Sequence, residues 1–154
     1  MKVKNMTVKS RLLELLEQHK GETMSGEDIG RELSCTRAAV WKAVKSLRQE
    51  GYPIEAGPNK GYMLARESNL LSVEGIKLFL EHPQVAVKLY DEISSTNLEA
   101  RQLAISGQAG HGSFVVALEQ SSGRGRKGRE FYSPKGSGIY LSVILEPEET
   151  LEGS

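Results

Sequence analysis

Apolar residues recur at helical spacing through the first fifty residues and form three separate stripes. The first stripe predicts an amphipathic helix and consists of Val8, Leu12, Leu15 and Leu16. Ser25 and Thr36 each precede a further stripe, at a position where a helix N-cap is expected. Gly51 follows the third stripe, as glycine commonly does at a helix end. The pattern predicts three helices, with a tight turn at residues 34–35 between the second and the third.

Two short strand-like runs follow, at residues 52–56 and 61–64, and they flank the turn-forming residues 57–60. Glycine, proline and asparagine in this turn favour a β-hairpin. A helix-turn-helix followed by a hairpin is the winged-helix arrangement. The sequence therefore predicts a winged helix-turn-helix domain over residues 1–64.

The rest of the chain alternates between helix and strand patterns. Residues 65–70 are mostly polar and predict a linker, so a second domain is expected over residues 71–154. Its expected elements are a helix at 71–80, strands at 85–90, 113–119 and 138–145, and a helix at 98–105. Thr96 and Glu99 fit a capping box at the start of the second of these helices. The fold class predicted for the whole chain is α+β.

Composition and charge narrow the classes of protein. The 154 residues suffice for one domain or two small ones, and the formal net charge is zero. Residues 1–64 nevertheless carry +3 and residues 65–154 carry −3, so a polyanionic partner is expected on the N-terminal part. The single cysteine, Cys35, excludes an internal disulfide and is expected to be a buried thiol. No apolar run has the length of a membrane helix or of a signal-peptide core, so a cytoplasmic protein is expected.

The third predicted helix carries cations and a tryptophan away from its apolar stripe. In DNA-binding helix-turn-helix domains, residues near the start of this helix contact base edges and phosphates. The candidate DNA-binding residues are Arg37, Ala38, Trp41, Lys42, Lys45 and, on the hairpin tip, Lys60. The alternatives are an ordinary solvated face and a winged helix that docks on a protein.

A basic, glycine-rich loop follows the strand-like run at 113–119. Its seven residues are Gly123, Arg124, Gly125, Arg126, Lys127, Gly128 and Arg129. Such a segment cannot bury its charged side chains, and Arg and Lys at this density favour phosphate or carboxylate. The glycines also spell the dinucleotide-binding pattern, but Ser133-Pro134 and Gly136 leave no room for the helix that this motif requires. The loop is expected to cover an anionic ligand.

A second candidate site lies at Ser95-Thr96-Asn97, where a strand-like run gives way to a helix. The simplest interpretation is a helix cap. The functional interpretation is that hydroxyl and amide groups at a helix N-terminus bind a polar ligand.

The order of these motifs resembles the biotin protein ligases. Ser-Ser-Thr-Asn at 94–97 is followed by Glu-Gln-Ser-Ser-Gly-Arg-Gly-Arg-Lys-Gly-Arg at 119–129, then by Phe-Tyr-Ser-Pro at 131–134 and Gly-Ile-Tyr-Leu-Ser at 138–142. With a winged helix in front, the chain looks like the bifunctional type, which is both ligase and biotin operon repressor. The resemblance implies that residues 71–154 are the first part of a class II synthetase-like α/β ligase domain.

The resemblance also implies an activity and a set of site residues. The family joins biotin and ATP, with Mg²⁺ expected, into biotinyl-5′-AMP and transfers biotin to a lysine of the carboxyl-carrier protein of acetyl-CoA carboxylase. The implied biotin-binding residues are Ser95, Thr96, Asn97, Gln120, Arg124, Gly125 and Arg126. Gly123, Lys127, Gly128 and Arg129 complete the adenylate loop, and Phe131 holds an aromatic position where tryptophan is common. Operator DNA and a ligand-dependent homodimer complete the implied partners.

One family motif has no counterpart in this sequence. The family carries a later Lys-Trp-Pro-Asn-Asp stretch whose lysine meets the ligand, and this chain contains no such catalytic lysine. We therefore expect the sequence to be the N-terminal portion of a ligase and, by itself, a poor catalyst. Two other classes stay open: a winged-helix regulator without ligase activity, and a nucleic-acid tether formed by the Arg-Gly cluster.

Overall fold

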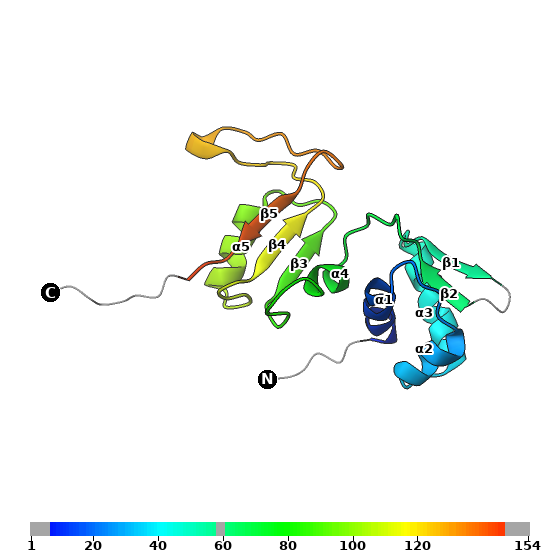
Figure 1. Ribbon diagram of the computed structural model, residues 1–154. Coiled ribbons are helices and arrows are strands. Elements are labelled where there is room, and N and C mark those ends of the chain that lie inside the picture. The colour runs from blue at the N-terminus through cyan, green and yellow to red at the C-terminus, as the bar shows by residue number, and fades with distance from the viewer. Residues whose placement is uncertain (1–6, 58–60, 147–154) are drawn as a thin grey trace. The chain divides into compact units, whose positions relative to one another are not determined.

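The computed structural model describes residues 7–57 and 61–146 (Figure 1). Contacts between residues divide the chain into two compact units, Met1–Phe79 and Leu80–Ser154. Each unit has its own apolar core. Among the described residues, no helix is long and apolar enough to cross a membrane.

The first unit contains the three predicted helices, α1 (Val8–Gln18), α2 (Gly26–Glu32) and α3 (Arg37–Gln49). Each begins after a hydroxyl-bearing N-cap whose side chain accepts a backbone N–H of the first turn; the caps are Thr7, Ser25 and Thr36. The fully buried core side chains come from all three helices and the following hairpin: Leu12, Leu16, Ile29, Val40, Leu47 and Leu64. Burying an aliphatic side chain of this kind contributes about 1.5–3 kcal/mol, so the apolar stripes fix how the helices pack.

A hairpin follows α3, formed by β1 (Ile54–Gly57) and β2 (Gly61–Leu64) in antiparallel register. Gly51 lies just past the helix with a left-handed φ of +94°, as its position in the sequence predicts. The Arg48 guanidinium donates from both Nε and Nη2 to the Ile54 carbonyl and ties the hairpin to α3. Met24, before α2, pairs with Tyr62 of β2, so the hairpin is also held by the segment between the first two helices.

Residues 71–80 are only partly helical. Helix α4 covers Val73–Lys77, with Ser72 as its N-cap. The buried Ser72 hydroxyl also donates to the Glu17 carboxylate of α1 at 3.0 Å. Because α4 packs on α1, it belongs to the first unit, whereas the sequence placed residues 71–80 in the second domain.

The second unit is a three-stranded sheet of order β3-β4-β5, made of β3 (Val87–Tyr90), β4 (Phe114–Ala117) and β5 (Tyr140–Val143). Strand β4 pairs in parallel with β3 and antiparallel with β5. Helix α5 (Thr96–Ile105) covers one face of the sheet. Its core consists of Ala100, Leu103, Ala109, Val115 and Ile144. The antiparallel β4–β5 pairing excludes the parallel crossover that a dinucleotide-binding motif needs.

Three local predictions were wrong. The N-cap of α5 is Ser95 instead of Thr96, and Ser95 makes no side-chain cap hydrogen bond. Glu99 does not close a capping box either, because its carboxylate accepts from the Tyr90 hydroxyl at 2.7 Å. This hydrogen bond is the main reason why the pKa of Tyr90 rises to about 12. Cys35 is half-buried instead of fully buried.

Candidate functional sites

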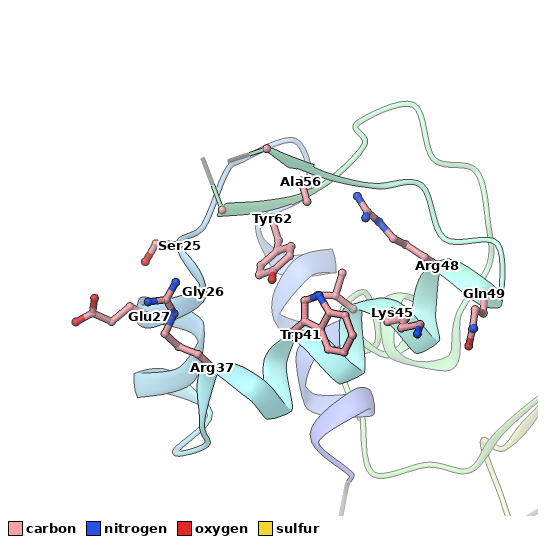
Figure 2. A pocket seen from close by; sticks show the side chains of 13 residues that line it. Ser25, Gly26, Glu27, Arg37, Trp41, Lys45, Arg48, Gln49, Ala56 and Tyr62 are labelled. Atoms are coloured by element: carbon pink, nitrogen blue, oxygen red, sulfur yellow. The ribbon is translucent and has the colours of Figure 1, made fainter. Parts of the chain in front are cut away.

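The outer face of α3 presents an aromatic ring among cations. Trp41 is 57% exposed although it is large and apolar, and Arg37 and Lys45 are exposed on the same side of the helix (Figure 2). The Lys45 Nζ lies 5.4 Å from the centre of the Trp41 ring, within the range of a cation–π interaction. The exposed Ala38 and Lys42 lie on the same helix. Lys60, the predicted contact on the hairpin tip, lies outside the described residues.

A hollow of about 750 Å³ lies between this helix and the hairpin. Trp41 and Tyr62 line it from opposite sides, and Arg37, Lys45 and Arg48 supply positive charge (Figure 2). Arg48 already engages the Ile54 carbonyl, so its guanidinium is committed in part to holding the hairpin. Glu27 also lines the hollow, so three cations face one carboxylate there. The surface is concave, aromatic and net positive, which suits a nucleic-acid backbone better than an apolar peptide.

In the second unit, backbone pairing brings two distant motifs together. The segment after β3 lies beside the segment after β4: Ser121 donates to the Ile93 carbonyl at 3.0 Å, and Ser122 donates to the Ser94 carbonyl at 2.9 Å. Because of this pairing, Thr96 at the start of α5 lies close to Gln120. The sequence named both residues as candidates, although 24 residues separate them.

A chain of polar side chains links these candidates. The Thr96 backbone N–H and hydroxyl both donate to Gln120 Oε1, at 2.8 and 3.1 Å. The Ser142 hydroxyl of β5 lies 2.9 Å from Thr96 Oγ1 and 3.0 Å from Asn97 Oδ1, so its one proton can go to either acceptor. Ser95 and Thr96 are only 2% and 4% exposed. The start of α5 is thus part of a polar cluster. Gln120 accepts the Thr96 N–H, the hydrogen bond that a capping side chain of the helix would otherwise make.

The basic loop forms a small hairpin that continues from the end of β4 (orange in Figure 1). Gly125 donates to the Arg129 carbonyl at 2.7 Å, and Phe131 donates to the Gly123 carbonyl at 2.8 Å. Its tip is a short 3₁₀ turn, η1 (Arg126–Gly128). The four cations of the loop are all exposed, and none takes part in an ion pair within the described ranges. They remain available to an anionic ligand.

A hollow of about 680 Å³ lies along this hairpin and is lined by residues 119–124 and 128–134. It brings Gln120 and Arg124 to one cavity with Ser133, a residue that the sequence had not marked as functional. Its signal was present in the Phe-Tyr-Ser-Pro motif at 131–134, which carries part of the family resemblance without indicating a role for the serine. Gly123 also has a role that the sequence did not show. It is buried, and a Cβ there would collide with the Phe131 carbonyl and the Ser133 hydroxyl.

Comparison with known proteins assigns the two units. Residues 8–63 match the HTH domain family, and residues 89–153 match the Biotin/lipoate A/B protein ligase family. The chain joins an HTH domain to a ligase-family segment. The winged helix described above lies within the first match, and the cluster around Gln120 and the basic hairpin lies within the second.

Curated relatives match this chain along nearly its whole length. The bifunctional ligase/repressor BirA of Bacillus spizizenii is 40% identical over 148 residues, which cover 95% of this chain and 45% of that protein. The bifunctional ligase/repressor BirA of Escherichia coli is 37% identical over 147 residues, which cover 96% of this chain and 44% of that protein. This chain therefore spans less than half the length of these relatives and is similar to their N-terminal part.

A solved structure is also similar in sequence over part of the chain. The biotin protein ligase from Leishmania major, in complex with biotinyl-5-AMP, is 37% identical over 36% of this chain and 22% of that one, with a TM-score of 0.30.

Within the ligase-family segment, the structure groups the predicted residues into two sets. Thr96, Asn97 and Gln120 are joined by hydrogen bonds through one another or through Ser142. Arg126, Lys127 and Arg129 lie on the hairpin tip and make no contact of this kind with the cluster. Within the described residues, no group of three His, Cys, Asp or Glu side chains is arranged to hold a metal ion.

Proposed function

We propose that this chain carries the DNA-binding part and the biotin- and adenylate-binding part of a biotin protein ligase that also represses transcription. The ligase would join biotin and ATP into biotinyl-5′-AMP and transfer biotin to a lysine of the carboxyl-carrier protein of acetyl-CoA carboxylase. The repressor would bind operator DNA, as a homodimer that forms when the adenylate is bound.

One observation carries the ligase proposal: the cluster of Thr96, Asn97 and Gln120 lies at the base of a hairpin whose exposed cations are unpaired among the described residues. Neutral hydroxyl and amide groups suit the polar, uncharged ring of biotin. Arg124 and Arg126 suit the carboxylate of biotin and the phosphates of ATP. The donor set therefore fits both substrates.

To form biotinyl-5′-AMP, the protein must stabilise negative charge on the phosphate and keep water away from the product. Attack of the biotin carboxylate on the α-phosphate of ATP forms a P–O bond and releases pyrophosphate. Charge builds on the phosphate oxygens, and positioned arginine donors stabilise that charge. The mixed anhydride hydrolyses readily, so a hairpin that closes over it protects the product. Mg²⁺ would enter with the phosphates of ATP.

The experiment is calorimetry of the chain with biotin, with and without ATP and Mg²⁺. We expect biotin to bind, and a variant with Arg124 and Arg126 both replaced by alanine to bind at least tenfold more weakly. The matched control replaces Lys88 and Arg101, two exposed cations outside the cavity, and lowers the charge equally. Absence of biotin binding to the unaltered chain would refute the ligase proposal and favour a winged-helix regulator without ligase activity.

The DNA-binding proposal rests on the exposed face of α3. Alanine at Arg37, Lys42 and Lys45 together should weaken binding to any duplex and lower the slope of log K against log [salt] by about 2–3. A triple variant at Lys88, Arg101 and Lys135 controls for net charge. Equal DNA affinity in the two triple variants would refute this assignment. Sedimentation with biotin and ATP tests the ligand-dependent dimer.

A further inference from the structure

The Gln120 carboxamide lies between Thr96 and the Ser133 hydroxyl, and these two partners determine which way it faces. On one side is the Thr96 N–H, which can only donate, at 2.8 Å from Oε1. On the other side is Ser133, whose hydroxyl donates to the Phe131 carbonyl at 3.0 Å. A carbonyl can only accept, so the single Ser133 proton is used there.

It follows that Ser133 Oγ can only accept from Gln120. The 3.0 Å contact with Gln120 therefore requires the nitrogen end of the carboxamide, Nε2, on this side. Both ends of the amide give the same orientation independently. Oε1 receives two hydrogen bonds from Thr96, and Nε2 gives one of its two hydrogens to Ser133.

Ser133 is built into this place. It is only 2% exposed, and its own carbonyl accepts from the Gln120 backbone N–H at 3.0 Å. Gly123 closes the same pocket, because a Cβ on it would approach both Ser133 Oγ and Gln120 Nε2. A side chain without the hydroxyl at position 133 would leave Nε2 without its acceptor.

We propose that Ser133 is a positioning residue of the ligand site, which holds the Gln120 carboxamide with its oxygen on Thr96. One Nε2 hydrogen then stays free to donate to an oxygen of the bound ligand. The proposal deepens the proposed function and rests on it, because it treats the cavity that Gln120 and Ser133 line as the biotin site. Loss of the Ser133 hydroxyl would affect the ligand only through Gln120. It would not alter the contacts proposed for Arg124 and Arg126 with the carboxylate and the phosphates.

The first test needs no ligand. In the Ser133→Ala variant, Gln120 loses its tether and the Thr96 amide loses part of its protection. We expect hydrogen exchange at Thr96 to accelerate roughly three- to tenfold, the range of one modest hydrogen bond. In a Gln120→Ala background the same change at Ser133 should add nothing, because the carboxamide that transmits it is gone. Ser106→Ala is the control: it also removes a serine hydroxyl that donates to a backbone carbonyl, at 3.2 Å, and lies outside the cavity.

The second test is biotin affinity by calorimetry, which should fall roughly three- to tenfold in Ser133→Ala and stay unchanged in Ser106→Ala. If Ser133→Ala loses exchange protection in β4, Ser133→Cys supplies the comparison, because it keeps a hydrogen-bonding atom on the side chain and its sulfur is a weaker acceptor than the serine oxygen. Thr96 exchange that is unaffected, or affected equally with and without Gln120, would overturn the proposal. If the unaltered chain does not bind biotin, the proposed function fails, whereas the Thr96 exchange data still decide the role of Ser133.

Discussion

Replacement of Gly123 by alanine should open the base of the basic hairpin. Gly123 is buried, and a Cβ there would meet the Phe131 carbonyl and Ser133 Oγ at distances that real Cβ atoms do not adopt. Overpacking of this kind costs about 1–3 kcal/mol. The Phe131 N–H donates to the Gly123 carbonyl at 2.8 Å, so the strain falls directly on this hydrogen bond. We expect hydrogen exchange of the Phe131 amide to accelerate by roughly 5- to 150-fold in Gly123→Ala.

The control comes from the same loop. At Gly125, with φ −89°, a Cβ would lie 3.4 Å from the Arg129 carbonyl, an ordinary contact. Gly125→Ala should therefore leave the Phe131 amide within about twofold of the original rate, or slow its exchange, because alanine restricts the unfolded chain. Two-dimensional NMR resolves the Phe131 amide, whereas fluorescence of the only tryptophan, Trp41, would report on the first unit. Equal acceleration in the two variants would show that loss of glycine flexibility, and not collision with Phe131 and Ser133, governs the loop.

Three further outcomes follow from the structure. Alanine at Arg124 or Arg126 should change the free energy of unfolding by no more than about 0.5 kcal/mol in urea melts, as at ordinary exposed sites, and a loss of several kcal/mol would make the loop structural. Tyr90 should ionise near pH 12 in a titration at 295 nm. Because its pKa is raised in the folded state, its stabilising contribution is complete below about pH 10 and is lost as the pH rises through 12; Glu99→Gln should lower the titration midpoint, and an unchanged midpoint would contradict the assigned cause. Arg48→Ala should speed exchange in the β1–β2 hairpin about two- to tenfold while Arg31→Ala does not, and equal rates in the two variants would show that the Arg48 hydrogen bonds do not hold the hairpin.

The sequence predicted the first three helices and the hairpin of the first unit, because their signals are local, whereas it placed the segment of α4 in the second domain. A hydroxyl cap and an apolar stripe of 3.6-residue period lie within one helix, so Ser25 and Thr36 mark their helices without help from distant residues. The parallel β3–β4 pairing and the contact of Thr96 with Gln120 depend on segments far apart in the chain. Periodicity does not encode such pairings, so Ser95-Thr96-Asn97 could be named from a local pattern, whereas Gln120 could be named only through the family resemblance.

The errors at α5 have the same origin. A Thr-x-x-Glu pattern predicts a capping box when the helix is considered alone. Here, Gln120 from the neighbouring segment after β4 accepts the Thr96 N–H, and the Tyr90 hydroxyl donates to the Glu99 carboxylate, so tertiary partners replace both local bonds. Helix α4 shows the opposite case, in which a predicted helix is shortened. The apolar run at residues 71–80 predicts a longer helix, but only Val73–Lys77, the segment that Ser72 caps and that packs on α1, is helical.

The pairing of Lys45 with Trp41 has a thermodynamic consequence for an approaching polyanion. A free lysine loses up to about 2 kcal/mol of rotamer entropy when it is immobilised, and a lysine already resting on an aromatic ring has surrendered part of this freedom. The same ring attracts the ammonium by roughly 0.5–1 kcal/mol. A phosphate that draws the lysine away from the ring must bind the ammonium by more than this amount. The smaller entropy loss favours phosphate binding, whereas the attraction to the ring opposes it. The indole therefore keeps the Lys45 ammonium close to the helix surface before the polyanion arrives. Displacement of the ammonium from the indole would change the emission of the only fluorophore of its kind in the chain, which makes Trp41 an intrinsic gauge of occupancy at this face.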